Sequence, residues 1–311
     1  MKNKFIYLKH TAGIYLLTSM WLISASVQAQ QFAAWSPPVN MGPSINTTNN
    51  EWHAAISADG LSIFFSSDRA GGFGAFDLWV AQRARPNADW GPAQNLGPTI
   101  NTFAGEFTPE LSPDGHWLFF SSSGFAMGDK FNIYASFRSD TSDNLGWGSP
   151  ANLGKGVNSN HGNGDPSLFI DPQTGVVTLY FARLDRNGQD DWNIYQSIQG
   201  ADGTFGDAVP VSELNTPDRE THPTVRRDGL EVLFTSDRPG SLGRVDLWVS
   251  TRATTTDKWS TPVNLGPTVN TQFNDRAPYL SDDGLSLILI SDRPGGFGWN
   301  DLYVSTRKKL E

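Results

Sequence analysis

The feature that most constrains the fold is a unit that occurs five times along the chain. Each unit begins with a short segment led by an aromatic residue: Trp35, Trp90, Trp147, Phe205 and Trp259. These residues are 55, 57, 58 and 54 positions apart. A repeat of this length indicates an array of similar structural units, in which each unit buries its apolar surface against its neighbours.

The content of the unit predicts a four-stranded antiparallel sheet. After the aromatic-led segment come an apolar segment, a tight turn and a second apolar segment, such as 61–67. The turn is Asp-Gly at 59–60, 114–115, 228–229 and 283–284, and Asp-Pro-Gln-Thr-Gly at 171–175. A glycine-rich loop then leads to a third apolar segment, such as 77–83. Glycine at these turns is typical of β-hairpins that require a positive φ.

These strands are apolar on both faces, so each small sheet must be covered on both sides. Radial packing of blades around an axis meets that requirement, and segments with helical periodicity are absent. We therefore predict an all-β fold, a single five-bladed β-propeller over residues 30–311 with four-stranded antiparallel blades. The chain begins with a lone aromatic-led strand near 35–42 and ends on a third strand at 301–307. The N-terminal strand is therefore expected to complete the last blade and close the ring.

The first residues predict export. Lys2, Lys4 and Lys9 precede an apolar run at 12–23, and the small residues at 27–29 suit cleavage after Ala29. Residues 1–29 are therefore read as a signal peptide, and the mature chain as periplasmic or secreted, with no membrane span after cleavage. The net charge of −9 argues against nucleic acid as a partner. With 0 Cys, neither disulfides nor thiolate chemistry can operate.

One motif carries a family resemblance. The pattern Asn-Thr, Glu, Ser-x-Asp-Gly, Phe-Ser-Ser-Asp-Arg-x-Gly-Gly-x-Gly and Asp-Leu, as at 46–78, resembles the WD40-like repeat called PD40. That repeat forms the propeller of the periplasmic protein TolB and occurs in bacterial envelope proteins with an OmpA-like domain. The resemblance covers residues 35–307 and implies a propeller. Such propellers bind proteins in some contexts and belong to enzymes in others, and no TolB N-terminal domain or OmpA-like tail is recognised in these 311 residues.

Residues that recur in every blade are interpreted as structural. The Asn of each Asn-Thr or Asn-Ser pair, as at Asn46, is expected to cap its own turn. The Asp-Arg pairs, as at 68–69, are expected to brace the glycine-rich loops. That loop joins two strands and is followed by no Lys-Ser/Thr, so it is not a phosphate loop. The Trp residues are expected to pack between blades, although some suit a sugar-stacking surface.

The start of the first strand in each blade supplies the candidate site, because this strand lies innermost in a propeller. Four carboxylates occupy one position of the repeat: Glu51, Glu106, Glu220 and Asp275. Two residues later come His53, His222 and, in the third blade, Asp165, where no other blade has an acid. These seven residues are predicted to surround the mouth of the central channel.

Converging carboxylates repel one another, and three arrangements relieve that repulsion. Five arginines can form structural ion pairs with them: Arg69, Arg219, Arg238, Arg276 and Arg293. Alternatively, a divalent cation such as Ca²⁺, or a transition ion, binds among the carboxylates and His53 and His222. Alternatively, one carboxyl stays protonated and acts as a general acid. The acidic run 185–191 fits no standard Ca²⁺ loop and is interpreted as solvated.

These observations leave two classes of function open. The first is a binding or interaction module of the bacterial cell envelope that takes a polar small molecule, a glycan or an envelope protein at the channel mouth. The alternative is a carbohydrate-active hydrolase or lyase that uses Glu, Asp and His at the same mouth. No nucleophile elbow, zinc-protease motif or nucleotide fingerprint points elsewhere. An enzyme requires an unequal mouth, and His53, His222 and Asp165 make it unequal.

Overall fold

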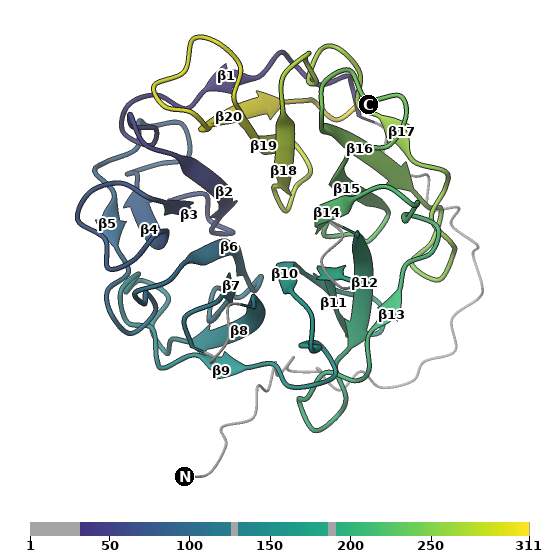
Figure 1. The fold of residues 1–311 in the computed structure, drawn as a ribbon, viewed down its shortest axis with the longest axis horizontal. Helices are drawn as coiled ribbons and strands as arrows, with labels where there is room; N and C mark the ends of the chain where they lie inside the picture. Colours follow the sequence, from purple (N-terminus) through teal and green to yellow (C-terminus); the bar gives the residue numbers. More distant parts are fainter. Residues whose placement is uncertain (1–31, 126–129, 186–190, 311) are drawn as a thin grey trace, which may run out of the picture.

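The computed structural model describes residues 32–125, 130–185 and 191–310. These residues form five separate four-stranded sheets with antiparallel pairing, arranged as blades around a central axis (Figure 1). The predicted all-β, five-bladed propeller is confirmed. No helix occurs in the described ranges, and therefore none there is long and apolar enough to cross a membrane.

The blades are numbered 1 to 5 along the chain, and each has an innermost, a second, a third and an outer strand. The innermost strands are β2 (Glu51–Ile56), β6 (Glu106–Leu111), β10 (Asn163–Ile170), β14 (Glu220–Val225) and β18 (Asp275–Leu280). The second strands are β3 (Ser62–Ser67), β7 (Trp117–Ser122), β11 (Val177–Leu184), β15 (Glu231–Ser236) and β19 (Ser286–Ser291). The third strands are β4 (Asp77–Gln82), β8 (Asn132–Phe137), β12 (Trp192–Ile198), β16 (Asp246–Thr251) and β20 (Asp301–Thr306). The outer strands are β5 (Gln94–Asn95), β9 (Ala151–Asn152), β13 (Val209–Pro210), β17 (Val263–Asn264) and β1 (Val39–Asn40).

The ring closes as the phase of the repeat predicts. Strand β1, near the N-terminus, pairs with β20, near the C-terminus, with Val39 opposite Val304 (Figure 1). Trp35 precedes this strand, is 9% exposed and stacks under the guanidinium of Arg307 at 4.3 Å. Closing the ring with both ends of the chain gives the last blade its fourth strand.

The core lies between blades rather than within one. Phe64 and Leu78 of blade 1 share a buried cluster with Leu118 and Phe120 of blade 2. Trp147, which leads the outer strand of blade 2, lies 6.0 Å from Phe64, measured between ring centroids. Burying a side chain such as Phe in this way stabilises a fold by about 2–3 kcal/mol. Trp147 thus packs between blades, as expected from the sequence.

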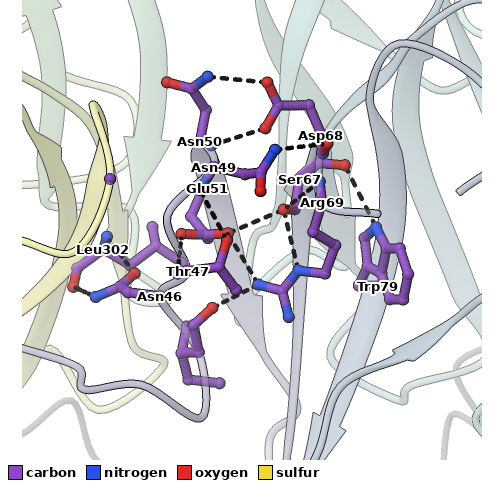
Figure 2. A network of polar contacts seen from close by, with 12 residues as sticks. Asn46, Thr47, Asn49, Asn50, Glu51, Ser67, Asp68, Arg69, Trp79 and Leu302 are labelled. Atoms are coloured by element: carbon purple, nitrogen blue, oxygen red, sulfur yellow. Dashed lines mark hydrogen bonds and ion pairs between the residues drawn. The ribbon is translucent and has the colours of Figure 1, made fainter. Parts of the chain in front are cut away.

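The recurring asparagine also joins neighbouring blades, which corrects the expectation that it caps only its own turn. The amide of Asn46 accepts the backbone N–H of Leu302 at 2.8 Å and donates to its carbonyl at 2.9 Å (Figure 2). The same double contact recurs in the other blades: Asn101 with Leu78, Asn158 with Ile133, Asn215 with Ile194, and Asn270 with Leu247. Each asparagine holds the third strand of the preceding blade, because its turn crosses from one blade to the next.

Close packing between loops explains one glycine of the glycine-rich loop. A Cβ at Gly74 would lie 2.3 Å from the carbonyl oxygen of Ala104 in the next blade, which is too close for any side chain. A Cβ at Gly243 would similarly lie 1.9 Å from the carbonyl oxygen of Phe273. The glycine-rich loops therefore lie directly against the Asn-Thr loops of the following blades.

Two predicted segments lie outside the described residues. The predicted signal peptide, residues 1–29, is one of them. Most of the acidic run 185–191 is the other, since residues 186–190 are not described. Both interpretations stay predictions.

Candidate functional site

The carboxylates at the start of the inner strands are buried and hold loops in place. Glu51 is 0% exposed. Its carboxylate accepts the backbone N–H of Thr47 at 2.7 Å, the hydroxyl of Ser67 at 2.9 Å and the guanidinium of Arg69 at 3.0 Å (Figure 2). The arginine of the Asp-Arg pair thus neutralises the inner-strand carboxylate, and Asp68 instead accepts from the backbone and side-chain amides of Asn50.

The same arrangement recurs with variations. Arg238 lies 2.8 Å from Glu220, and Arg293 lies 2.5 Å from Asp275. Glu106 is the exception, because it accepts from Thr102 and Ser122 and makes no ion pair with an arginine among the described residues. Burial raises the pKa of Glu51, Glu106 and Glu220. These carboxylates therefore fit the structural ion-pair arrangement for three blades.

The other three candidate residues lie together, although they come from three different blades. The Nε2 atom of His222 lies 3.4 Å from Oδ1 of Asp165. The backbone N–H of His222 also donates to Oδ2 of the same carboxylate at 3.2 Å. The ring of His53 stacks on that of His222, with centroids 6.0 Å apart and planes 25° from parallel. We call these three residues the Asp–His cluster.

A strand irregularity directs these side chains to one place. Asp165 and His222 have φ of 57° and 50°, in the left-handed region that L-residues seldom occupy. Each sits at a β-bulge where the inner strand shifts register against its neighbour, between Gly164 and Ser167 and between Thr221 and Thr224. A bulge bends the strand and redirects the side chain. The sequence signal is a proline after each of these residues, at 166 and 223, as also after Thr108 and Ala277.

Burial dominates the electrostatics of the Asp–His cluster. Desolvation lowers the pKa of His53 to about 3, with a further contribution from His222, and it lowers the pKa of His222 to about 3. Both imidazoles are therefore neutral at pH 7. Desolvation raises the pKa of Asp165 to about 6. Nδ1 of His53 and Nδ1 of His222 are buried without a hydrogen-bond partner among the described residues.

A cavity of about 250 Å³ opens beside this cluster at the end of the channel where the inner strands begin. We call it the mouth pocket. Asp165 and His222 line it together with Thr108, Ser121 and Thr235. Its aromatic wall consists of Trp52, Phe107, Phe131 and Trp192. None of the four inner-strand carboxylates lines the mouth pocket.

Two arginines complete the lining of the mouth pocket, Arg219 and Arg276. The sequence offered Arg276 as a counter-charge for the inner-strand carboxylates, and the structure does not place it there. Its guanidinium instead donates to the amide oxygen of Asn300 at 2.7 Å and stacks over Trp52 at 4.3 Å. Asp275, its neighbour in sequence, is paired with Arg293.

Sequence reasoning missed the aromatic wall of the mouth pocket. Trp52 and Phe107 lie one residue after the inner-strand carboxylates and one residue before the position that His53 occupies in the first unit. The same intermediate position holds Gly164, Thr221 and Arg276 in the other blades, and all five residues line the pocket. Comparing this position across the five units provides the signal.

A second cavity, of about 220 Å³, lies where the inner strands end. Glu110 and Tyr279 line it, and neither was singled out from the sequence. Burial raises the pKa of Glu110 to about 8 and raises that of Tyr279. Glu110 accepts the backbone N–H of Leu168 in the next blade at 3.1 Å, and Tyr279 donates to the carbonyl of Ile56 at 2.8 Å. Both side chains thus link neighbouring blades.

For the divalent-cation alternative, the part of the chain that the structure describes offers no grouped set of ligands. Within residues 32–125, 130–185 and 191–310, no three His, Asp or Glu side chains are grouped so that they could hold a metal ion. The Asp–His cluster can donate and accept protons beside a cavity.

Comparison with solved structures whose TM-scores exceed 0.5 supports the fold. No protein-family model matches the chain, and no curated protein matches its sequence. The catalytic domain of a GH62 α-L-arabinofuranosidase from Coprinopsis cinerea is similar over 88% of this chain and 97% of its own, with a TM-score of 0.55 and 15% identity. A xylan β-1,4-xylosidase from Bacillus halodurans C-125 is similar over 86% of this chain and 54% of its own, with a TM-score of 0.58 and 13% identity. A TolB protein from Agrobacterium tumefaciens covers 90% of this chain and 99% of its own, with a TM-score of 0.49 and 13% identity.

Proposed function

We propose that this chain is an exported carbohydrate-active enzyme, a hydrolase or lyase, that works from the mouth pocket with Asp165 as its acid–base group. The observation that carries the proposal is the convergence of Asp165 and His222 beside a cavity with an aromatic wall. The structurally similar α-L-arabinofuranosidase and xylosidase support the same class of substrate.

The protonation of Asp165 suits this role. A carboxyl whose pKa is about 6 exchanges its proton close to neutral pH, where general acid–base catalysis is most efficient. His222 acts as a positioning residue, because its backbone N–H and its ring both contact the carboxylate. Trp52 and Phe107 give the pocket an aromatic surface against which a sugar ring can pack.

A second candidate function is a binding module that takes a glycan or an envelope protein at the same mouth, and one observation favours it. Glycosidases of the common type use two carboxyl groups separated by roughly 5–9.5 Å. Among the described residues that line the mouth pocket, Asp165 is the single carboxyl. A pocket that binds without catalysis requires no second carboxyl.

The test is to incubate the purified mature chain with a panel of plant and bacterial oligosaccharides. Newly formed reducing ends report hydrolysis, and new ultraviolet absorbance reports the unsaturated product of a lyase. We expect turnover in the wild type, with Asp165→Asn inactive but still binding, and with the melting temperature of His222→Gln changed by only a few degrees. Sugar binding without products would establish the binding module instead. If the chain neither binds nor converts any sugar in the panel, the enzyme and the glycan-binding module are both wrong, and only an envelope-protein partner is left.

Export is part of this proposal, because it would bring the mature chain to extracellular or periplasmic glycans. Its support is the basic and apolar start of the sequence. Cell fractionation followed by N-terminal sequencing tests it. A mature chain that begins at Gln30 supports export, and an uncleaved chain in the cytoplasm contradicts it.

A further inference from the structure

Arg276 carries a positive charge that no carboxylate in the described part of the chain pairs with. Its hydrogen bond goes to the neutral amide of Asn300 at 2.7 Å, and its guanidinium lies over the ring of Trp52. Its Nε atom is buried and has no partner among the described residues. The guanidinium thus lines the mouth pocket with hydrogen-bonding capacity to spare.

Several buried or half-buried arginines of this propeller are paired with carboxylates. Arg69, Arg238 and Arg293 each contact a carboxylate, at 3.0, 2.8 and 2.5 Å. Arg307 is paired with Glu231.

Arg138, which is 2% exposed, lacks a carboxylate partner in the described part of the chain, but it donates to the carbonyls of Gly115 and Asp143 and to the amide oxygen of Asn144. Arg276 differs, because it lines a cavity and its Nε has no partner among the described residues. Burying such a charge is costly, and a ligand that supplies the counter-charge and the missing hydrogen bond offsets that cost.

Arg276 has other arginines nearby as well as the carboxylate of Asp292, in a chain whose net charge is −9. Arg219 lines the same pocket. Burial lowers the pKa of Arg276, and the positive charges of Arg219 and Arg244 lower it further, against the opposing influence of Asp292. An anion in the mouth pocket would therefore lie close to two guanidinium groups.

We infer that the mouth pocket takes an anionic sugar, whose carboxylate or sulfate group binds the guanidinium of Arg276 beside Arg219. The sugar ring lies against the aromatic wall formed by Trp52 and its neighbours, and its reacting bond faces Asp165. This inference rests on the proposed carbohydrate function and adds the class of substrate. The planar guanidinium presents parallel N–H groups that match both carboxylate and sulfate oxygens.

The chemistry also predicts strong discrimination against neutral sugars. A neutral sugar leaves Arg276 buried without a counter-charge, and sites built for a polar group reject analogues that lack it. A hydrogen bond to a charged group contributes enough to change affinity by about tenfold or more. Because salt screens the attraction between a free anionic sugar and the arginines of the pocket, binding weakens as ionic strength rises.

The experiment compares matched pairs of oligosaccharides by titration calorimetry. The first pair is an oligogalacturonate and its carboxyl-reduced counterpart, and the second pair is a sulfated oligosaccharide and its desulfated counterpart. We expect at least one anionic member to bind about tenfold or more tightly than its neutral counterpart. The pair that shows this preference identifies which anion the pocket takes. Arg276→Gln is expected to abolish the preference.

Two further variants keep the test interpretable. Arg83→Gln is the matched control, because the Arg83 guanidinium stacks on Trp90 at 4.1 Å, away from the mouth pocket, and this variant should retain the preference. If Arg276→Gln fails to fold, Arg276→Lys replaces it, since lysine keeps the charge but loses the planar geometry and should weaken the preference. Equal binding of the anionic and neutral members overturns the inference and leaves the proposed function standing. The inference is also overturned if Arg276→Gln keeps the preference, and absence of binding by every sugar overturns both proposals.

Discussion

The imidazole Nε2 of His222 lies 3.4 Å from the carboxylate of Asp165, although the two residues belong to different blades. The contact spans the boundary between blades 3 and 4 and lies beside the mouth pocket. Burial raises the pKa of this carboxyl and lowers the pKa of this imidazole. This pair differs from the inner-strand carboxylates, whose partners lie within their own blade.

Asp165→Asn should stabilise the protein above pH 6. The folded-state pKa of Asp165 is about 6, raised from its usual 3.8, so its contribution to stability is complete below pH 3.8 and is lost as the pH rises through 6. Removing the charge should raise the free energy of unfolding at pH 8 by up to about 3 kcal/mol, with no gain at pH 3.5. Urea titrations at both pH values measure this, and a destabilised variant at pH 8 contradicts it.

His53 should control part of the acid sensitivity of the propeller. Its folded-state pKa of about 3 lies below the usual 6.5, so the stability it contributes is present above pH 6.5 and declines as the pH falls toward 3. His53→Asn should reduce the slope of unfolding free energy against pH by about 1.4 kcal/mol per pH unit between pH 4 and 6. Above pH 7.5 the two curves should run parallel. Equal slopes between pH 4 and 6 would refute the prediction.

Glu220→Gln should destabilise the fold more than Glu106→Gln. The first change leaves Arg238 buried without its counter-charge, and breaking such a pair costs about 3 kcal/mol. Glu106 occupies the same position in blade 2 and is held by Thr102 and Ser122, so its replacement should cost only about 1 kcal/mol. Chemical denaturation of both variants provides the comparison. Equal losses would show that the arginine does not matter.

Glu110→Gln should stabilise the protein in alkaline solution. The folded-state pKa of Glu110 is about 8, raised from 4.5, so its contribution to stability is complete below pH 4.5 and is lost as the pH rises through 8. Gln keeps an oxygen to accept the N–H of Leu168 and cannot ionise. The melting temperature of the variant should exceed that of the wild type at pH 9 and equal it at pH 4. A lower melting temperature at pH 9 would contradict this.

Removal of strand β1 should destabilise the whole ring. A mature chain that begins after Asn40 lacks the strand that pairs with β20, and it loses Trp35 from its contact with Arg307. Loss of a buried Trp side chain alone costs about 3–5 kcal/mol. Thermal unfolding should shift to a clearly lower temperature as one transition. The control is a chain that begins at Phe32, and identical melting of the two chains would rule out this closure.

Much of the fold could be predicted from the sequence. Five similar units with apolar strands and Asp-Gly turns specify five blades, and the phase of the repeat specifies that β1 joins β20. Both follow from the pattern of one unit, which occurs five times along the chain. The resemblance to the PD40 repeat stays a prediction, because no comparison tests that repeat.

The sequence by itself determined which residues share a position in the repeat, and only the tertiary structure decided what those positions face. Asn46 bonds with Leu302, 256 residues away, because its turn meets the preceding blade across the ring closure. Glu51 and Asp165 both belong to inner strands, yet Glu51 forms an ion pair with Arg69 whereas Asp165 lines the mouth pocket. The physical reason is that a bulge of one residue redirects a side chain, and the contacts between blades that it then makes involve residues distant in the sequence.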